Sequence, residues 1–153
     1  MPNATILKFN YPDSLLREYE NWVVLLRPEQ VTAGSLILAC KLEATKMSDV
    51  SQDAFSELSR ITGEMEKVLQ KVFAYDKINY LLLMMVDKHV HFHVLPRYAD
   101  PREVFGVEFK DASWPRPPDL SKVVDITREQ YNKLLHHMRD NWQTIASAEA
   151  TGR

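Results

Sequence analysis

Three histidines alternate with apolar residues in the segment DKHVHFHVLPRY, at positions 89, 91 and 93. Because side chains alternate between the two faces of a β-strand, His89, His91 and His93 would share one face, and Val90 and Phe92 the other. A face of valine and phenylalanine suits a core, so the histidine face is expected to line a cleft, a surface or an interface. Imidazoles in such a row would supply proton donors and acceptors near neutral pH.

Three interpretations of this row compete. A purely structural role poorly explains three of the chain's five histidines at strict alternation. A zinc or copper ion could bridge imidazoles two residues apart, but the neighbouring acid is Asp87 and no further His, Cys or Glu cluster follows, so no metal site is expected. In the third interpretation, a neutral imidazole attacks an activated phosphoryl group while a second imidazole holds its oxygens. We favour covalent catalysis, because one strand face would hold the groups in alignment.

The apolar pattern predicts the strands that position this row. Nearly continuous apolar runs predict strands over residues 21–28 and 35–40, joined by a short turn. Two more strands are predicted over 77–86 and 89–98, separated by little more than Asp87 and Lys88, which is the spacing of a hairpin. Short connections between neighbouring strands favour an antiparallel sheet.

Two helices are predicted to pack on this sheet. One begins after an N-cap at Ser51 and carries apolar residues at spacings of three or four from Phe55 to Val72, and the other begins near Thr127. The predicted fold class is α+β, with an antiparallel sheet of about five strands, a long helix packed on it and a C-terminal helix. Residues 1–147 are expected to form a single domain and 148–153 a flexible tail.

The composition is that of an ordinary globular domain. The chain has 153 residues, of which 45% are hydrophobic and 26% charged, so it can bury a core. A formal net charge of −2 gives no basic surface for nucleic acid. Neither a signal-peptide pattern nor an apolar run long enough to span a bilayer is present. We therefore expect a cytoplasmic protein without nucleic-acid or membrane partners.

The seven residues HVHFHVL resemble the signature of the histidine triad family, and the continuation LPRY resembles its fragile histidine triad branch, which cleaves dinucleoside polyphosphates. Upstream, NWVVLLRPEQVTAGSLILACK is similar to that family's strand, turn and strand before the long helix, so the resemblance covers roughly residues 20–98. It implies a histidine-triad fold and a nucleotide hydrolase or transferase. The implied substrate is a dinucleoside polyphosphate such as diadenosine tetraphosphate, whose cleavage releases a nucleoside monophosphate.

The resemblance also implies roles for individual residues. His91 would be the nucleophile that forms a nucleotidyl-histidine intermediate, and His89 and His93 would position and neutralise the phosphate. In the family a backbone carbonyl fixes the tautomer of the nucleophile, so no acidic partner is required. Leu25 and Arg27 would lie near the nucleotide, because the family binds the base and ribose at the first strands.

Two departures from the family pattern bear on the substrate. Arg27 stands where relatives carry Asn or Asp, and arginine would favour phosphate over a pair of ribose hydroxyls. The segment LLLMMVDK replaces the glycine-rich polar loop that usually precedes the triad. Arg97, directly after the triad motif, is expected either to contact a second phosphate or to form an ion pair on the surface.

The remaining expectations concern cofactors, partners and alternatives. No tightly bound cofactor is expected, and Mg²⁺ would enter only with the substrate. Family members usually form two-fold dimers that join two sheets into one, so a homodimer is expected. Two alternative functions stay open: a nucleoside phosphoramidate hydrolase, which would prefer a P–N bond, and a nucleotide- or metal-binding module without turnover.

Overall fold

The computed structural model describes residues 2–151. Five strands form one antiparallel sheet in the order β1-β2-β3-β5-β4: β1 (Leu15–Glu18), β2 (Trp22–Leu26), β3 (Leu36–Cys40), β4 (Lys77–Leu82) and β5 (His91–Arg97). The helices are α1 (Ala4–Lys8), α2 (Gln52–Phe73) and α3 (Arg128–Thr151), with a 3₁₀ turn at Met47–Asp49. A separate hairpin pairs β6 (Arg102–Val104) with β7 (Val107–Phe109). The predicted α+β class with a five-stranded antiparallel sheet is confirmed.

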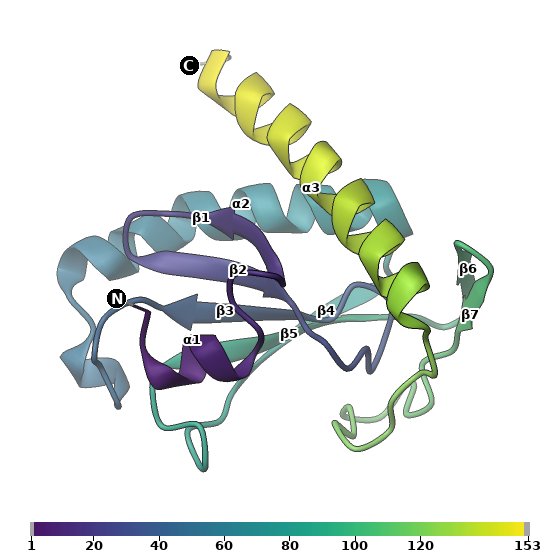
Figure 1. Ribbon diagram of the computed structural model, residues 1–153, viewed down its shortest axis with the longest axis horizontal. Helices are drawn as coiled ribbons and strands as arrows, with labels where there is room; N and C mark the ends of the chain where they lie inside the picture. The colour runs from purple at the N-terminus through teal and green to yellow at the C-terminus, as the bar shows by residue number, and fades with distance from the viewer. Residues whose placement is uncertain (1, 152–153) are drawn as a thin grey trace.

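The sheet separates two apolar clusters. Its larger cluster packs beneath α2 and α3, and includes Val24, Leu38 and Val94 of the central strands. The smaller cluster lies on the opposite face, where Ile37 of β3 packs against Ile6 of α1. Figure 1 shows this layering, with α2 along one side of the sheet and the short α1 on the other. Alternation along each strand thus sends successive side chains to different layers.

Helix α2 begins where the sequence predicts. The Ser51 side chain accepts a hydrogen bond from the Ala54 backbone N–H at 3.2 Å, which caps the first turn. At its other end, α2 packs on the turn between β2 and β3. A Cβ on Gly34, which has a φ of +80°, would lie 2.6 Å from Phe73 Cε2. Glycine is required there both for the backbone conformation and for the close packing.

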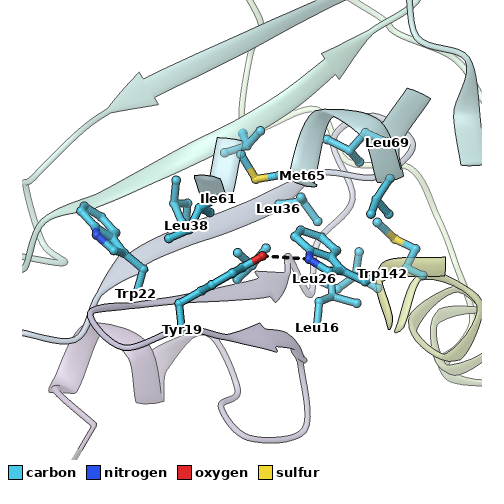
Figure 2. Close-up of a cluster of buried hydrophobic side chains, with 14 of the residues drawn as sticks. Leu16, Tyr19, Trp22, Leu26, Leu36, Leu38, Ile61, Met65, Leu69 and Trp142 are labelled. Carbon is cyan, nitrogen blue, oxygen red and sulfur yellow. Dashed lines mark hydrogen bonds between the residues drawn. The ribbon is translucent and has the colours of Figure 1, made fainter. Parts of the chain in front are cut away.

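Helix α3 is tied to the core by buried polar contacts as well as apolar ones. Trp142 donates from Nε1 to the Tyr19 hydroxyl at 2.9 Å, and Tyr19 donates in turn to the Glu64 carboxylate of α2 at 3.0 Å. Figure 2 shows the Trp142–Tyr19 bond among the apolar side chains of the larger cluster. The bond satisfies an indole N–H that would otherwise be buried without a partner.

The connection between β4 and β5 is longer than predicted. The strand predicted over 77–86 ends at Leu82, which pairs with Phe92, and residues 83–90 form a loop. The two-residue turn inferred at Asp87 and Lys88 was therefore wrong. The backbone just before β5 pairs elsewhere, because the Val90 N–H donates to Ala44 and the Val90 carbonyl accepts from Cys40.

Both ends of the chain differ from expectation. Neither α1 nor β1 was predicted, since a five-residue helix and a four-residue strand leave little periodic signal. At the C-terminus α3 continues through Thr151, so residues 148–151 of the expected flexible tail are helical. Residues 152–153 lie outside the described part of the chain.

Candidate active site

The histidine row lies on the face of the sheet that α1 covers. His91 and His93 belong to β5, while Phe92 between them packs against the larger core on the other face. His89 lies in the loop before β5, and its ring contacts Thr5 of α1. All three imidazoles are buried. The sheet and α1 therefore enclose a polar row within an otherwise apolar layer.

His91 is held in one tautomer by the backbone. Its Nδ1 lies 2.7 Å from the carbonyl oxygen of His89, so Nδ1 carries the proton and donates. Within residues 2–151, only Arg27 Nε and His93 Nδ1 are buried side-chain polar atoms without a partner. The Nε2 of His91 makes no hydrogen bond and is absent from that pair, so it borders open space although the residue is only 1% exposed. The arrangement leaves an unprotonated nitrogen available for reaction.

The ring of His89 is held on both sides. Its Nδ1 lies 3.0 Å from the Thr5 hydroxyl, which also accepts the His89 backbone N–H at 3.2 Å. Its Nε2 lies 2.7 Å from the carboxylate of Glu43. Every group is satisfied if Nε2–H donates to Glu43 and the Thr5 hydroxyl donates to Nδ1. This fixes the His89 ring beside the carbonyl that orients His91.

His93 is neutral at physiological pH. Its pKa is lowered from 6.5 to about 4, chiefly by burial and in smaller part by the electrostatic influence of His91 and Arg27, against the opposing effect of Asp87. The ring stands nearly edge-on to His91, with centroids 5.2 Å apart, and Phe9 packs against both rings. Its buried Nδ1 has no hydrogen-bond partner. His93 can therefore offer a neutral imidazole to a ligand.

A cavity of about 320 Å³ opens beside His93. This volume is at the low end of the range for small-molecule sites. Its walls are built by the end of α1, the chain after β2, the loop before β5, and β5 itself. The lining residues are Lys8, Phe9, Arg27, Pro28, Glu29, Asp87 and His93. The Lys8 ammonium lies 2.7 Å from the Asp87 carboxylate and joins α1 to the loop.

The three other candidate residues are placed differently from one another. Arg27 lines the cavity beside His93. Leu25, two residues earlier, is fully buried in the apolar cluster under α1 and does not line the cavity. Arg97, at the far end of β5, is fully engaged with groups of the chain. Its guanidinium pairs with Asp111 at 2.7 and 3.1 Å and also donates to Asn79.

The ion pair of Arg97 holds the proline-rich arm to the sheet. Burial alone would raise the pKa of Asp111, but hydrogen bonds from Arg97 and from backbone N–H groups keep it below its usual value. Arg97 also donates to the carbonyl oxygen of Arg116. Of the two roles expected for Arg97, the structure shows the ion pair, which is buried rather than on the surface.

The structure adds site residues that the sequence did not reveal. Thr5 and Lys8 belong to α1 and Phe9 caps its C-terminal end, and this five-residue helix carried no recognisable pattern. Glu43 lies three residues after β3, and its carboxylate reaches the His89 ring across the start of β5. The β3–β5 pairing explains why an acid just beyond β3 lies near the start of β5, but no local sequence pattern encodes that pairing.

Within residues 2–151, no group of three or more His, Cys, Asp and Glu side chains is arranged to hold a metal ion. No helix in the same range is both long and apolar enough to cross a membrane.

Comparison with known families identifies the group to which the site belongs. A family model described as the HIT domain matches residues 8–100, more than half of the chain, and this range includes the histidine row. The chain belongs to the HIT domain family. No curated protein matched this HIT chain by sequence.

Solved structures share its fold. A histidine triad protein from Bradyrhizobium japonicum superposes with a TM-score of 0.71 at 15% identity, covering 92% of this chain and 96% of the other. A histidine triad protein from Sinorhizobium meliloti gives a TM-score of 0.70 at 17% identity, with the same coverage. A zinc-bound histidine triad family protein from Mycobacterium smegmatis gives 0.63 at 17% identity, covering 94% and 93%. At these identities the likeness concerns the fold.

Proposed function

We propose that this HIT chain is a nucleotide hydrolase or transferase of the fragile histidine triad type. Its substrate is a dinucleoside polyphosphate such as diadenosine tetraphosphate, and its product is a nucleoside monophosphate. Family membership supports a nucleotide-directed function, and the LPRY continuation after the triad favours this branch.

One observation carries the proposal. The 2.7 Å bond from His91 Nδ1 to the His89 carbonyl places the lone pair of the ring on Nε2, which borders open space without a partner. A neutral imidazole with an available nitrogen is a competent nucleophile toward an activated phosphoryl group. A purely structural histidine would use both of its nitrogens in hydrogen bonds.

The reaction has two steps. In the first, the Nε2 lone pair of His91 forms a bond to the α-phosphorus, and the bond from that phosphorus to the bridging oxygen breaks, so the rest of the phosphate chain leaves with the electron pair. The His89 carbonyl stabilises the positive charge that develops on the ring. In the second, water attacks the same phosphorus, the P–N bond breaks and its electron pair returns to Nε2. The water supplies one proton to solvent and a hydroxyl to the released monophosphate.

The other two histidines position the phosphate. His89, fixed by Thr5 and Glu43, and His93, a neutral ring on the cavity wall, flank His91 on the same side of β5. His93 contributes a hydrogen bond to a non-bridging oxygen, and His89 does so when that oxygen replaces the exposed Glu43 carboxylate at its Nε2. Because the protein holds these groups before the substrate binds, little reorganisation is needed during the reaction.

The test is a substrate panel with wild type, His91→Gly and an exposed control, His136→Gly. The panel contains diadenosine tri- and tetraphosphate and an adenosine phosphoramidate, with Mg²⁺ or a chelator. Phosphorus NMR follows products and intact-mass analysis detects an adenylyl adduct. We expect AMP release and an adduct in wild type and in the His136 variant, and neither in His91→Gly.

Other outcomes would replace the proposal. Faster cleavage of the phosphoramidate than of either polyphosphate would indicate a phosphoramidate hydrolase. Binding without turnover or adduct would indicate a nucleotide-binding module, and stoichiometric metal that resists chelation a metal-binding one. Full activity in His91→Gly would refute the covalent route.

A further inference from the structure

The cavity beside His93 is lined by charged side chains that have no role in the proposed two-step reaction. Two cations, Lys8 and Arg27, and two carboxylates, Glu29 and Asp87, line it, together with the neutral ring of His93. Each cation has one carboxylate nearby: Lys8 lies 2.7 Å from Asp87, and Arg27 lies 3.9 Å from Glu29. The second of these contacts is at the outer limit of an ion pair.

Among the charged residues that line the cavity, Arg27 is unusual because it is buried and only partly hydrogen-bonded. The residue is only 9% exposed, and its Nη1 donates to the backbone carbonyl of Glu29 at 2.6 Å, but its Nε is buried without a partner. The Glu29 side chain that faces it is 70% exposed, so solvent weakens their attraction. Burial lowers the pKa of the guanidinium, and Glu29 opposes that change. A buried cation with an open donor is costly unless an anion joins it.

The second unpaired atom belongs to a residue of the same cavity wall. Among the described residues, Arg27 Nε and His93 Nδ1 are the only buried side-chain nitrogens or oxygens without a hydrogen bond. Both belong to residues that line this cavity. By contrast Arg97, the other buried arginine, has donors to Asp111, Asn79 and a backbone carbonyl. Unsatisfied polar groups are thus concentrated where a ligand would sit.

We infer that Arg27, assisted by Lys8, forms a subsite for a second phosphate of the substrate, separate from the phosphoryl group that His91 attacks. The inference rests on the proposed function, and it makes Arg27 a residue that determines specificity. A phosphate oxygen accepts from the Arg27 guanidinium, and its partial burial strengthens that charge-assisted bond. The second phosphate is either the next one along a polyphosphate chain or one carried on the ribose.

The neighbouring segments explain why Lys8 takes part. It ends α1, and its ion pair with Asp87 holds α1 against the loop before β5, which hangs on the same side of the sheet (Figure 1). A phosphate entering the cavity competes with Asp87 for the ammonium. The loop itself offers no polar donor at Met84 or Met85, so Lys8 of α1 and Arg27, directly after β2, supply the positive charge in its place.

Binding in the absence of turnover tests this subsite. The full chain carries His91→Asn, and calorimetry compares AMP, ATP and adenosine 3′,5′-bisphosphate. We expect ATP or the bisphosphate to bind about tenfold more tightly than AMP, the worth of one charge-assisted hydrogen bond. A gain for ATP alone identifies a chain phosphate, and a gain for the bisphosphate alone a ribose phosphate. Equal affinity for all three compounds would overturn the inference.

Variants of the cavity residues give effects of opposite sign. Arg27→Gln should abolish the affinity gap between AMP and the doubly phosphorylated ligand, while the exposed control Arg128→Gln keeps it. Glu29→Gln, which removes a competing carboxylate at an exposed side chain, should widen the gap, and Lys8→Gln should narrow it. These two side chains are 70% and 54% exposed, so the variants fold even if Arg27→Gln does not. An Arg27 variant that weakens AMP and ATP equally would refute a phosphate-specific role.

The outcomes separate this inference from the proposed function. An adenylyl adduct on His91 without any affinity gap would leave the covalent mechanism standing and remove the subsite. A gap that depends on Arg27 in a protein that forms no adduct would retain the subsite and remove the mechanism.

Discussion

Acid should destabilise this protein through one residue of the site, His93. Its pKa is about 4 in the folded chain and 6.5 when exposed. Between these values the unfolded chain binds a proton that the folded chain does not, so the free energy of unfolding falls as pH drops from about 6.5 to about 4. Each pH unit in this window contributes about 1.4 kcal/mol, and the interval from 6.5 to about 4 therefore corresponds to about 3 kcal/mol.

The measurement is urea unfolding of wild type and His93→Gln at a series of pH values from 7 to 4. Glutamine keeps a polar side chain of similar size but does not titrate, so the pH dependence that differs between the two proteins belongs to position 93. We expect wild type to lose about 3 kcal/mol more than the variant across this range. If the two proteins lose stability in parallel, His93 is not buried as a neutral ring and its description above is wrong.

Three further predictions concern contacts away from the site. Asp111→Asn, which leaves the buried Arg97 without its carboxylate, should lower the free energy of unfolding by about 3 kcal/mol, and a loss near zero in urea unfolding would show the pair to be unimportant. Trp142→Phe should lower the free energy of unfolding by about 1 kcal/mol from the lost hydrogen bond to Tyr19 alone, and the smaller side chain should lower it further. Thermal unfolding would show this as a lower melting temperature. If the expected homodimer pairs through β4, the sheet edge opposite β1, Leu81→Asp should convert it to a monomer. Light scattering measures the mass in solution, and a mass unchanged from wild type would exclude that edge as the dimer interface.

Local sequence signals were enough for the core of the fold. Alternation at residues 89–93 identified the histidine face, and the apolar stripe after Ser51 identified α2, because both signals lie within single elements. The turn before the triad was misplaced for a non-local reason. The backbone at Val90 pairs with Cys40 and Ala44 rather than with β4, and no pattern within residues 83–90 encodes that partner.

The missing parts of the site have the same cause. Thr5 lies 84 positions before the histidine whose ring it holds, and Glu43 lies 46 positions before it. Such contacts depend on how α1 and the end of β3 come together across the sheet, which sequence spacing does not specify. Arg97 shows the converse case. Its position beside the triad strand suggested a ligand contact, yet tertiary structure supplies the Asp111 carboxylate instead.

The protonation state of His93 should depend on whether a phosphate is bound in the site. The family resemblance assigns His93 to neutralising the phosphate, but the ring is neutral at pH 7 in the unbound chain because it is buried and lies near the positive charge of Arg27. A phosphate held by Arg27 would offset that charge and add a negative one, and both changes favour protonated His93. Neutralisation would then begin when the substrate arrives. Without substrate, a neutral His93 avoids placing a second buried positive charge beside Arg27. When the phosphate binds, it promotes protonation of His93, and the protonated ring then attracts the phosphate.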